Sequence, residues 1–106
     1  MILTTTHNVE GKTIDQYLGI VFGEVITGTD VIKDIGAGFK DFFGGRSTGY
    51  EETLIKTRKE ALDEIQQRAS ELNADAIIGL KMDYETLGGN NSILMVTVSG
   101  TAVSFK

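Results

Sequence analysis

The residues best suited to bind a ligand form one glycine-rich turn: Gly44, Gly45, Arg46 and Ser47. Two consecutive glycines allow neighbouring backbone N–H groups to point to the same side, and a helix that starts just after them adds partial positive charge. The Arg46 guanidinium can close over a phosphate or carboxylate from this position. The turn therefore predicts a small-ligand or anion site.

A structural interpretation of the same turn is favoured over the anion site. Glu51 and Glu52 stand in the first turn of the following helix, where they already use its free N–H groups and its dipole. The turn also lacks the Gly-x-x-x-x-Gly-Lys spacing of a nucleotide-binding loop. A tight turn between helices, with Arg46 in a salt bridge within the chain or to a neighbouring subunit, fits these residues.

Two carboxylates form a second candidate site, an acidic cluster of Asp83 and Glu85. Side chains two apart on a strand share a face, so this pair is able to hold a hard cation. The solvated face of an outer strand is the favoured alternative, because no glycine-spaced calcium loop accompanies the pair. His7 is the single histidine, and we expect a solvated side chain there. No catalytic constellation is predicted, and no strained elbow motif flanks any serine.

Composition excludes several classes of function. The 106 residues hold 10 Lys and Arg against 15 Asp and Glu, a net charge of −5 with a pI near 4.7. This balance argues against partners that are nucleic acids or anionic membranes, both of which need a basic face. Cysteine is absent, so thiolate ligands and thiol nucleophiles are excluded. We expect no cofactor and no metal site within one subunit.

The chain is expected to be a single domain over residues 1–106, located in the cytoplasm. The amino terminus has no basic segment ahead of an apolar one and no small-residue cleavage site. The most apolar stretch of the chain, residues 18–26, is interrupted by Gly19, Gly23 and Glu24. It is far shorter than the roughly 20 residues that span a bilayer.

The first half of the chain predicts a strand and a short helix. Residues 17–27 read as a strand with Leu18, Ile20, Phe22 and Ile26 on one side and with Val21 and Val25 on the other. Gly19 and Gly23 indicate a bulge or a close backbone approach. A short glycine-rich helix is predicted from Asp30 to about Phe43.

The second half predicts one long helix and a β-hairpin. Thr48 and Glu51 form a capping box, and Asn73 is a left-handed stop. The predicted buried stripe of the helix consists of Leu54, Arg58, Ala61, Leu62, Ile65, Ala69 and Leu72.

The hairpin joins strands at residues 76–86 and 92–105. One face of its first strand is predicted to carry Ala76, Ile78, Leu80, Met82 and Tyr84. The favoured register places Met82 opposite Val96 and Leu80 opposite Val98, because a shift by one residue mixes the apolar and polar faces.

The strands are apolar on both faces, which predicts association of copies. The last strand carries Ile93, Met95, Val103 and Phe105 on its second face. A single helical layer covers only one face of a sheet, so another copy of the chain is the favoured cover for the other face. The alternative is that the short helix or the amino-terminal segment covers that face within one subunit.

Four motifs in this order resemble the YbjQ-type family of small, uncharacterised bacterial proteins labelled "putative heavy-metal-binding". They are Gly44–Ser47 with Tyr50 and Glu51, residues 72–79 (Leu-Asn-Ala-Asp-Ala-Ile-Ile-Gly), Asp83–Glu85, and residues 100–103 (Gly-Thr-Ala-Val). The resemblance covers nearly the whole chain. It implies an α+β subunit related to the dodecin-like fold, assembled as a homopentameric ring.

The expected fold is thus a two-layer α+β subunit, an antiparallel sheet packed by one long and one short helix. The leading function is a non-enzymatic homo-oligomeric binding or scaffold protein whose partner is itself, with any ligand at subunit junctions. One alternative is heavy-metal binding, as the family label suggests, with His7 or the acidic pair contributed to a ring axis. The other alternative is an enzyme whose site is shared between subunits.

Overall fold

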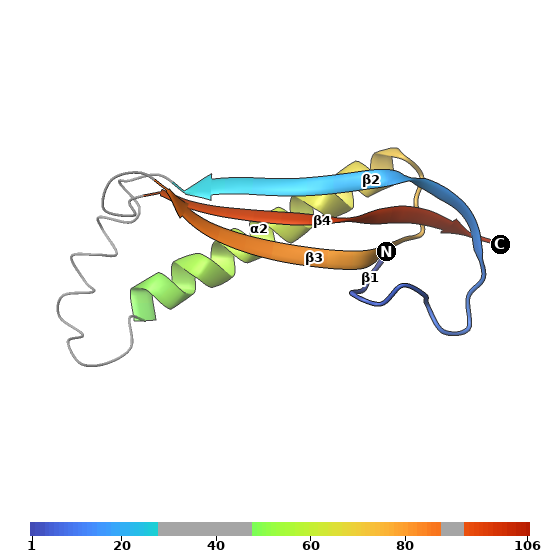
Figure 1. Ribbon diagram of the computed structural model, residues 1–106, viewed down its shortest axis with the longest axis horizontal. Coiled ribbons are helices and arrows are strands. Elements are labelled where there is room, and N and C mark those ends of the chain that lie inside the picture. Colours follow the sequence, from blue (N-terminus) through green and yellow to red (C-terminus); the bar gives the residue numbers. More distant parts are fainter. Residues whose placement is uncertain (28–47, 88–92) are drawn as a thin grey trace.

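The computed structural model describes residues 1–27, 48–87 and 93–106. Its elements are β1 (Ile2–Leu3), β2 (Ile14–Thr27), α2 (Thr48–Glu71), β3 (Ala76–Leu87) and β4 (Ile93–Phe105). The strands form one sheet in the order β1-β3-β4-β2, and α2 crosses one face of it (Figure 1). This arrangement confirms the α+β class. The short helix expected from Asp30 lies outside the described residues.

The sheet is mixed, so the prediction of an antiparallel sheet was wrong. β1 runs parallel to β3, with Ile2 opposite Ala76, while the other pairings are antiparallel. The amino-terminal segment continues along β3 beyond β1, and the Thr4 N–H donates to the Ile77 carbonyl at 2.9 Å. A β-rich run of residues does not reveal the direction of the strand beside it, so this pairing was not predictable.

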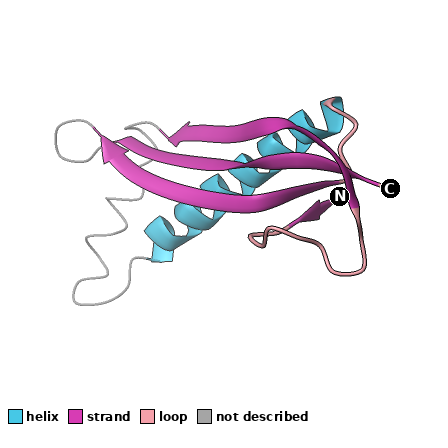
Figure 2. Ribbon diagram, turned by 45° about the vertical axis from the view of Figure 1, so that its right-hand side comes forward, coloured by secondary structure: helices cyan, strands magenta, loops and turns pink. Residues whose placement is uncertain are grey.

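α2 lies against one face of the sheet (Figure 2), and the main core is formed between the two. Small residues of the helix, Ala61 and Ala69, face the sheet, and Gly23 of β2 lies directly opposite. A Cβ atom at position 23 would collide with the Ala61 carbonyl oxygen. The close backbone approach predicted for Gly23 is therefore confirmed. The buried members of this core are Val21, Ala61, Ile65, Ala69, Ile77, Leu94, Val96, Val98 and Ala102.

The predicted bounds of the long helix are confirmed, but its buried stripe was wrong at two positions. Arg58 and Leu72 are exposed, whereas the polar residue Thr57 is buried. The Thr57 hydroxyl donates to the Thr53 carbonyl at 2.7 Å, which satisfies it inside the helix. Leu72 follows the last helical residue, so helical spacing no longer determines where its side chain lies.

Asn73 terminates α2 as predicted, with a φ of 60°. The Ala74 N–H donates to the Ala69 carbonyl at 3.1 Å, and the Asn73 N–H donates to the Ser70 carbonyl at 2.9 Å. These two bonds form a Schellman cap, which satisfies carbonyls at the helix end and turns the chain directly into β3.

A bulge in β3 overturns the predicted common face for Ala76, Ile78, Leu80 and Met82. Ile78 is opposite Thr101, but the next pair is Lys81 with Ser99, so two residues of β3 oppose one of β4. Gly79 adopts a φ of 61° at this point. The extra residue reverses the alternation, so Leu80 and Met82 pack on the α2 side while Ala76 and Ile78 belong to a second cluster.

Between the bulge and the hairpin loop, the predicted register was wrong by two residues. Met82 pairs with Val98 and Tyr84 with Val96, whereas Met82 was expected opposite Val96. A displacement of two residues keeps every side chain on the same face, so alternation of apolar residues does not distinguish the two registers. β3 extends to Leu87, one residue further than predicted, and β4 begins at Ile93, one residue later than predicted.

Candidate interaction surface

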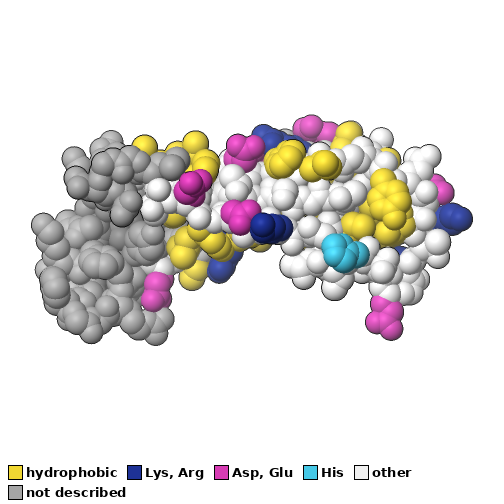
Figure 3. Space-filling model, viewed as in Figure 1, with side chains coloured by type: hydrophobic (Ala, Val, Ile, Leu, Met, Phe, Trp, Pro, Cys, Tyr) yellow, Lys and Arg dark blue, Asp and Glu magenta, His cyan; other side chains and the backbone are white. Residues whose placement is uncertain are grey.

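The face of the sheet opposite α2 carries a row of exposed apolar side chains along β2. We call this row the open strip; its members are Tyr17, Ile20, Phe22 and Ile26. Their relative exposures range from 48% to 71%, which is high for large apolar residues. Figure 3 shows this face, with separate groups of hydrophobic side chains and acidic side chains between them. Large apolar side chains that are exposed along one strand are typical of an interaction site.

Leu18 does not belong to the open strip, although alternation predicted it there. Tyr17 pairs with Val103 and Gly19 with Ala102, so Leu18 is an extra residue in β2. Gly19 adopts a φ of 131°, and Leu18 packs against the core beside α2. The bulge predicted near Gly19 is confirmed, and its effect on Leu18 is the reversal of faces that a bulge produces.

The amino-terminal segment covers part of the same face. Val9 packs on a second cluster formed by Ala76, Ile78 and Val103, and Ile14 and Phe105 complete that cluster. The alternative in which the amino-terminal segment covers the second face within one subunit is therefore right for this region. It is not right for the open strip, whose side chains stay exposed in the described part of the chain.

The amino-terminal segment is fixed to the bulge in β3. The Gly79 N–H donates to the Thr6 carbonyl at 2.8 Å, and the Leu80 N–H donates to the Thr4 carbonyl at 3.0 Å. An open groove of about 810 Å³ lies along this segment and is lined by Ile2, Thr4, Thr6, His7, Asn8, Val9 and Glu10. His7 is exposed, as predicted, and its ring lies beside Gly79.

Asp83 and Glu85 lie on the face of β3 opposite α2, where they pair with Thr97 and Met95 of β4. Both carboxylates are exposed, and the Lys81 ammonium lies 3.9 Å from the nearer oxygen of Asp83. Lys81 thus provides positive charge beside one of the two carboxylates. The pair shares a face as predicted, and its use as a cation site remains a prediction.

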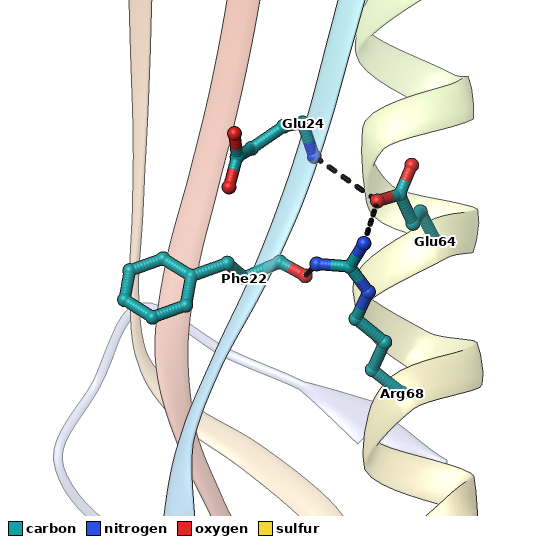
Figure 4. Close-up of polar contacts among 4 residues, drawn as sticks. All are labelled: Phe22, Glu24, Glu64 and Arg68. Carbon is teal, nitrogen blue, oxygen red and sulfur yellow. Dashed lines mark hydrogen bonds and ion pairs between the residues drawn. The ribbon is translucent and has the colours of Figure 1, made fainter.

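The outer edge of β2 contacts α2, a feature that the sequence analysis missed. Arg68 donates from Nη1 to the Phe22 carbonyl at 2.8 Å, and its Nη2 lies 2.6 Å from Oε1 of Glu64 (Figure 4). The Glu24 N–H donates to the same Oε1 at 3.5 Å. Four-residue spacing predicts that Glu64 and Arg68 can pair, but it contains no signal for the strand that they reach.

The described residues do not fit a heavy-metal centre within one subunit. Across residues 1–27, 48–87 and 93–106, no three His, Cys, Asp or Glu side chains are close enough to hold one ion. The internal methionines, Met82 and Met95, lie on opposite faces of the sheet, because Met82 packs in the α2 core while Met95 alternates with the buried Leu94 and Val96. The chain has no cysteine to supply a thiolate.

The glycine-rich turn, Gly44 to Ser47, lies outside the described residues, so its anion site remains a sequence prediction. Within the described ranges, no helix combines the length and apolar character needed to cross a bilayer.

Comparison with known proteins places the chain in a family. All of it, residues 1–106, matches the YbjQ family model, whose description is "Putative heavy-metal-binding". The chain belongs to the YbjQ family. A "UPF0145 protein" of Listeria ivanovii is 60% identical over 103 residues, which cover 97% of this chain and 94% of the relative. A UPF0145 protein of Listeria welshimeri is 59% identical over the same shares. The resemblance noted from the four motifs is therefore confirmed.

A solved structure supports the fold of this YbjQ-family chain. It is a crystal structure from Pediococcus pentosaceus of a protein of unknown function in the DUF74 family. The match has a TM-score of 0.64 at 22% identity and covers 100% of this chain and 98% of the other. Neither this description nor the names of the Listeria relatives states an activity.

Proposed function

We propose that this YbjQ-family chain is a non-enzymatic binding or scaffold protein that works as a homo-oligomer, with the open strip buried between copies. The exposure of Tyr17, Ile20, Phe22 and Ile26 carries the proposal. Burial of apolar surface stabilises by about 25 cal/mol per Å², so four such side chains on one strand favour association strongly. Among the described residues of one subunit, no three His, Cys, Asp or Glu side chains are close enough together to hold one metal ion.

A second copy of the chain is the occupant that the two edges of the sheet favour. The two edges of the sheet differ: β2 carries the open strip, while the β1 edge carries exposed Met1 and Ile2 beside the amino-terminal groove. Two different apolar surfaces on opposite edges fit head-to-tail association, which closes into a ring when the rotation between copies permits. The dodecin-like, pentameric ring implied by the family resemblance has this kind of interface.

Native mass spectrometry and light scattering at low micromolar concentration test the assembly. We expect a discrete species of five times the 11.5 kDa chain mass. Ile20→Lys places a charge in the middle of the open strip and is expected to convert the assembly largely to monomer, because an unpaired buried charge is costly. Leu72→Lys is the matched control, since Leu72 is also exposed but follows α2, outside the strip.

Two results would contradict the proposal: a stable wild-type monomer, or equal dissociation by Ile20→Lys and Leu72→Lys. The same spectra report any retained metal or small molecule. A metal retained by the wild type and lost in His7→Ala would favour the metal-binding function instead.

The glycine-rich turn supplies a separate test of the proposed ligand site at subunit junctions. Arg46→Ala is expected to weaken phosphate binding, measured by titration calorimetry, while the mass of the assembly stays unchanged. If Arg46→Ala instead breaks the assembly, Arg46 is a structural contact at the interface and the anion site is rejected.

A further inference from the structure

β2 is a long edge strand of the described sheet and carries exposed apolar side chains. A strand of another chain can pair with such an edge in an uncontrolled way. β2 has 14 residues, and among the described strands it pairs only with β4. Its side chains at Ile20, Phe22 and Ile26 are exposed. An exposed, long and hydrophobic edge strand is a template for another chain, and proteins usually protect such an edge with charges or a covering element.

At the centre of this edge, two side chains of α2 take the place of a neighbouring strand. The Phe22 carbonyl accepts a hydrogen bond from Arg68, and the Glu24 N–H donates to Glu64 (Figure 4). These groups flank Gly23, and they are the acceptor and donor that one residue of an added parallel strand would use. The close approach of the helix at Gly23 brings both side chains within reach.

A second ion pair on α2 shows that this contact is specific to one face. Lys59 and Asp63 have the same four-residue spacing and lie 3.1 Å apart, but their side chains are 76% and 65% exposed. Arg68 and Glu64 are 47% and 32% exposed, and they contact the strand as well as each other.

We propose that the Glu64–Arg68 pair blocks strand addition by a second copy of this chain at the edge of β2. An incoming strand must displace the guanidinium from the Phe22 carbonyl and leave the ion pair beside a desolvated edge. Copies are thereby directed to associate through side chains of the open strip, and growth by edge-to-edge pairing is suppressed. This blocking role does not depend on whether the chain is a monomer or an oligomer.

The test compares Arg68→Met with Lys59→Met in the full chain. Thioflavin T fluorescence and pelleting assays follow the growth of β-rich aggregates, and circular dichroism confirms that each variant is folded at the assay temperature. Arg68→Met is expected to aggregate at least about tenfold faster than wild type, the factor expected from loss of one charge-assisted hydrogen bond. Lys59→Met is expected to match wild type.

Arg68→Lys separates the blocking role from a general loss of stability. Lysine keeps a donor for the Phe22 carbonyl but lacks the fork that binds Glu64 at the same time, so an intermediate rate is expected. Equal aggregation of folded Arg68→Met and Lys59→Met would overturn the inference. The mass of the unaggregated wild type reports on the homo-oligomer independently, so either proposal can fail without the other.

Discussion

Replacing Gly23 with alanine is expected to lower the free energy of unfolding by about 3 kcal/mol, at the upper end of the usual cost of overpacking. The new Cβ would overlap the Ala61 carbonyl oxygen and approach the Ile65 backbone nitrogen to 3.1 Å. Both atoms belong to the helix backbone, so no side-chain rotation relieves the contact. α2 as a whole must move away from β2, which loosens the core on both sides.

Urea denaturation at fixed protein concentration measures this loss. Glu24→Ala is the control, because Glu24 is the next residue on the same strand and its side chain is exposed. We expect a change of no more than about 0.5 kcal/mol for the control. A Gly23→Ala protein as stable as Glu24→Ala would show that the helix does not approach β2 this closely.

Replacing Ile65 with alanine is expected to cost about 2–5 kcal/mol, because it removes buried methylene groups and leaves a cavity. Ile65 is fully buried at the centre of the interface between α2 and the sheet, beside Ala61 and Ala69. The flanking alanines are too small to fill the space, and the helix backbone is already in contact with Gly23. The site therefore has little capacity to collapse.

Ile55→Ala is a matched control for Ile65→Ala. It is the same substitution in the same helix, but Ile55 is 54% exposed while Ile65 is 0% exposed. Thermal or urea unfolding should give a loss of less than about 1 kcal/mol for Ile55→Ala. Similar losses for the two variants would contradict the assignment of the buried face of α2.

Much of the local structure was predictable because it depends on residues near one another in the sequence. Helical spacing identified Ala61, Ile65 and Ala69 as core positions, and all three are fully buried. Asn73 was identified as the end of the helix because few other residues adopt a positive φ at low cost. The family was recognised from four short motifs in a fixed order, and the match over residues 1–106 confirms it.

The sequence pattern failed where one residue changes the alternation of a strand. The bulge at Gly79 places Ile78 and Leu80 on opposite faces, and the bulge at Tyr17–Gly19 moves Leu18 to the core. A glycine permits a bulge without requiring one, so the pattern of apolar residues could not locate the reversal. The membership of the open strip depends on the bulge in β2, so the apolar pattern alone placed Leu18 in it wrongly.

Composition and short-range spacing were enough to predict the α+β class, the long helix with its stop at Asn73, and the lack of a thiolate site or of a histidine cluster within one subunit. Three features became visible only in the folded chain: β1 runs parallel to β3, the amino-terminal segment covers one part of the sheet face opposite α2, and Arg68 reaches the Phe22 carbonyl. The physical reason is that each of these contacts joins segments distant in the chain. Their partners are selected by the geometry of the packed layers, which no local pattern of residues encodes.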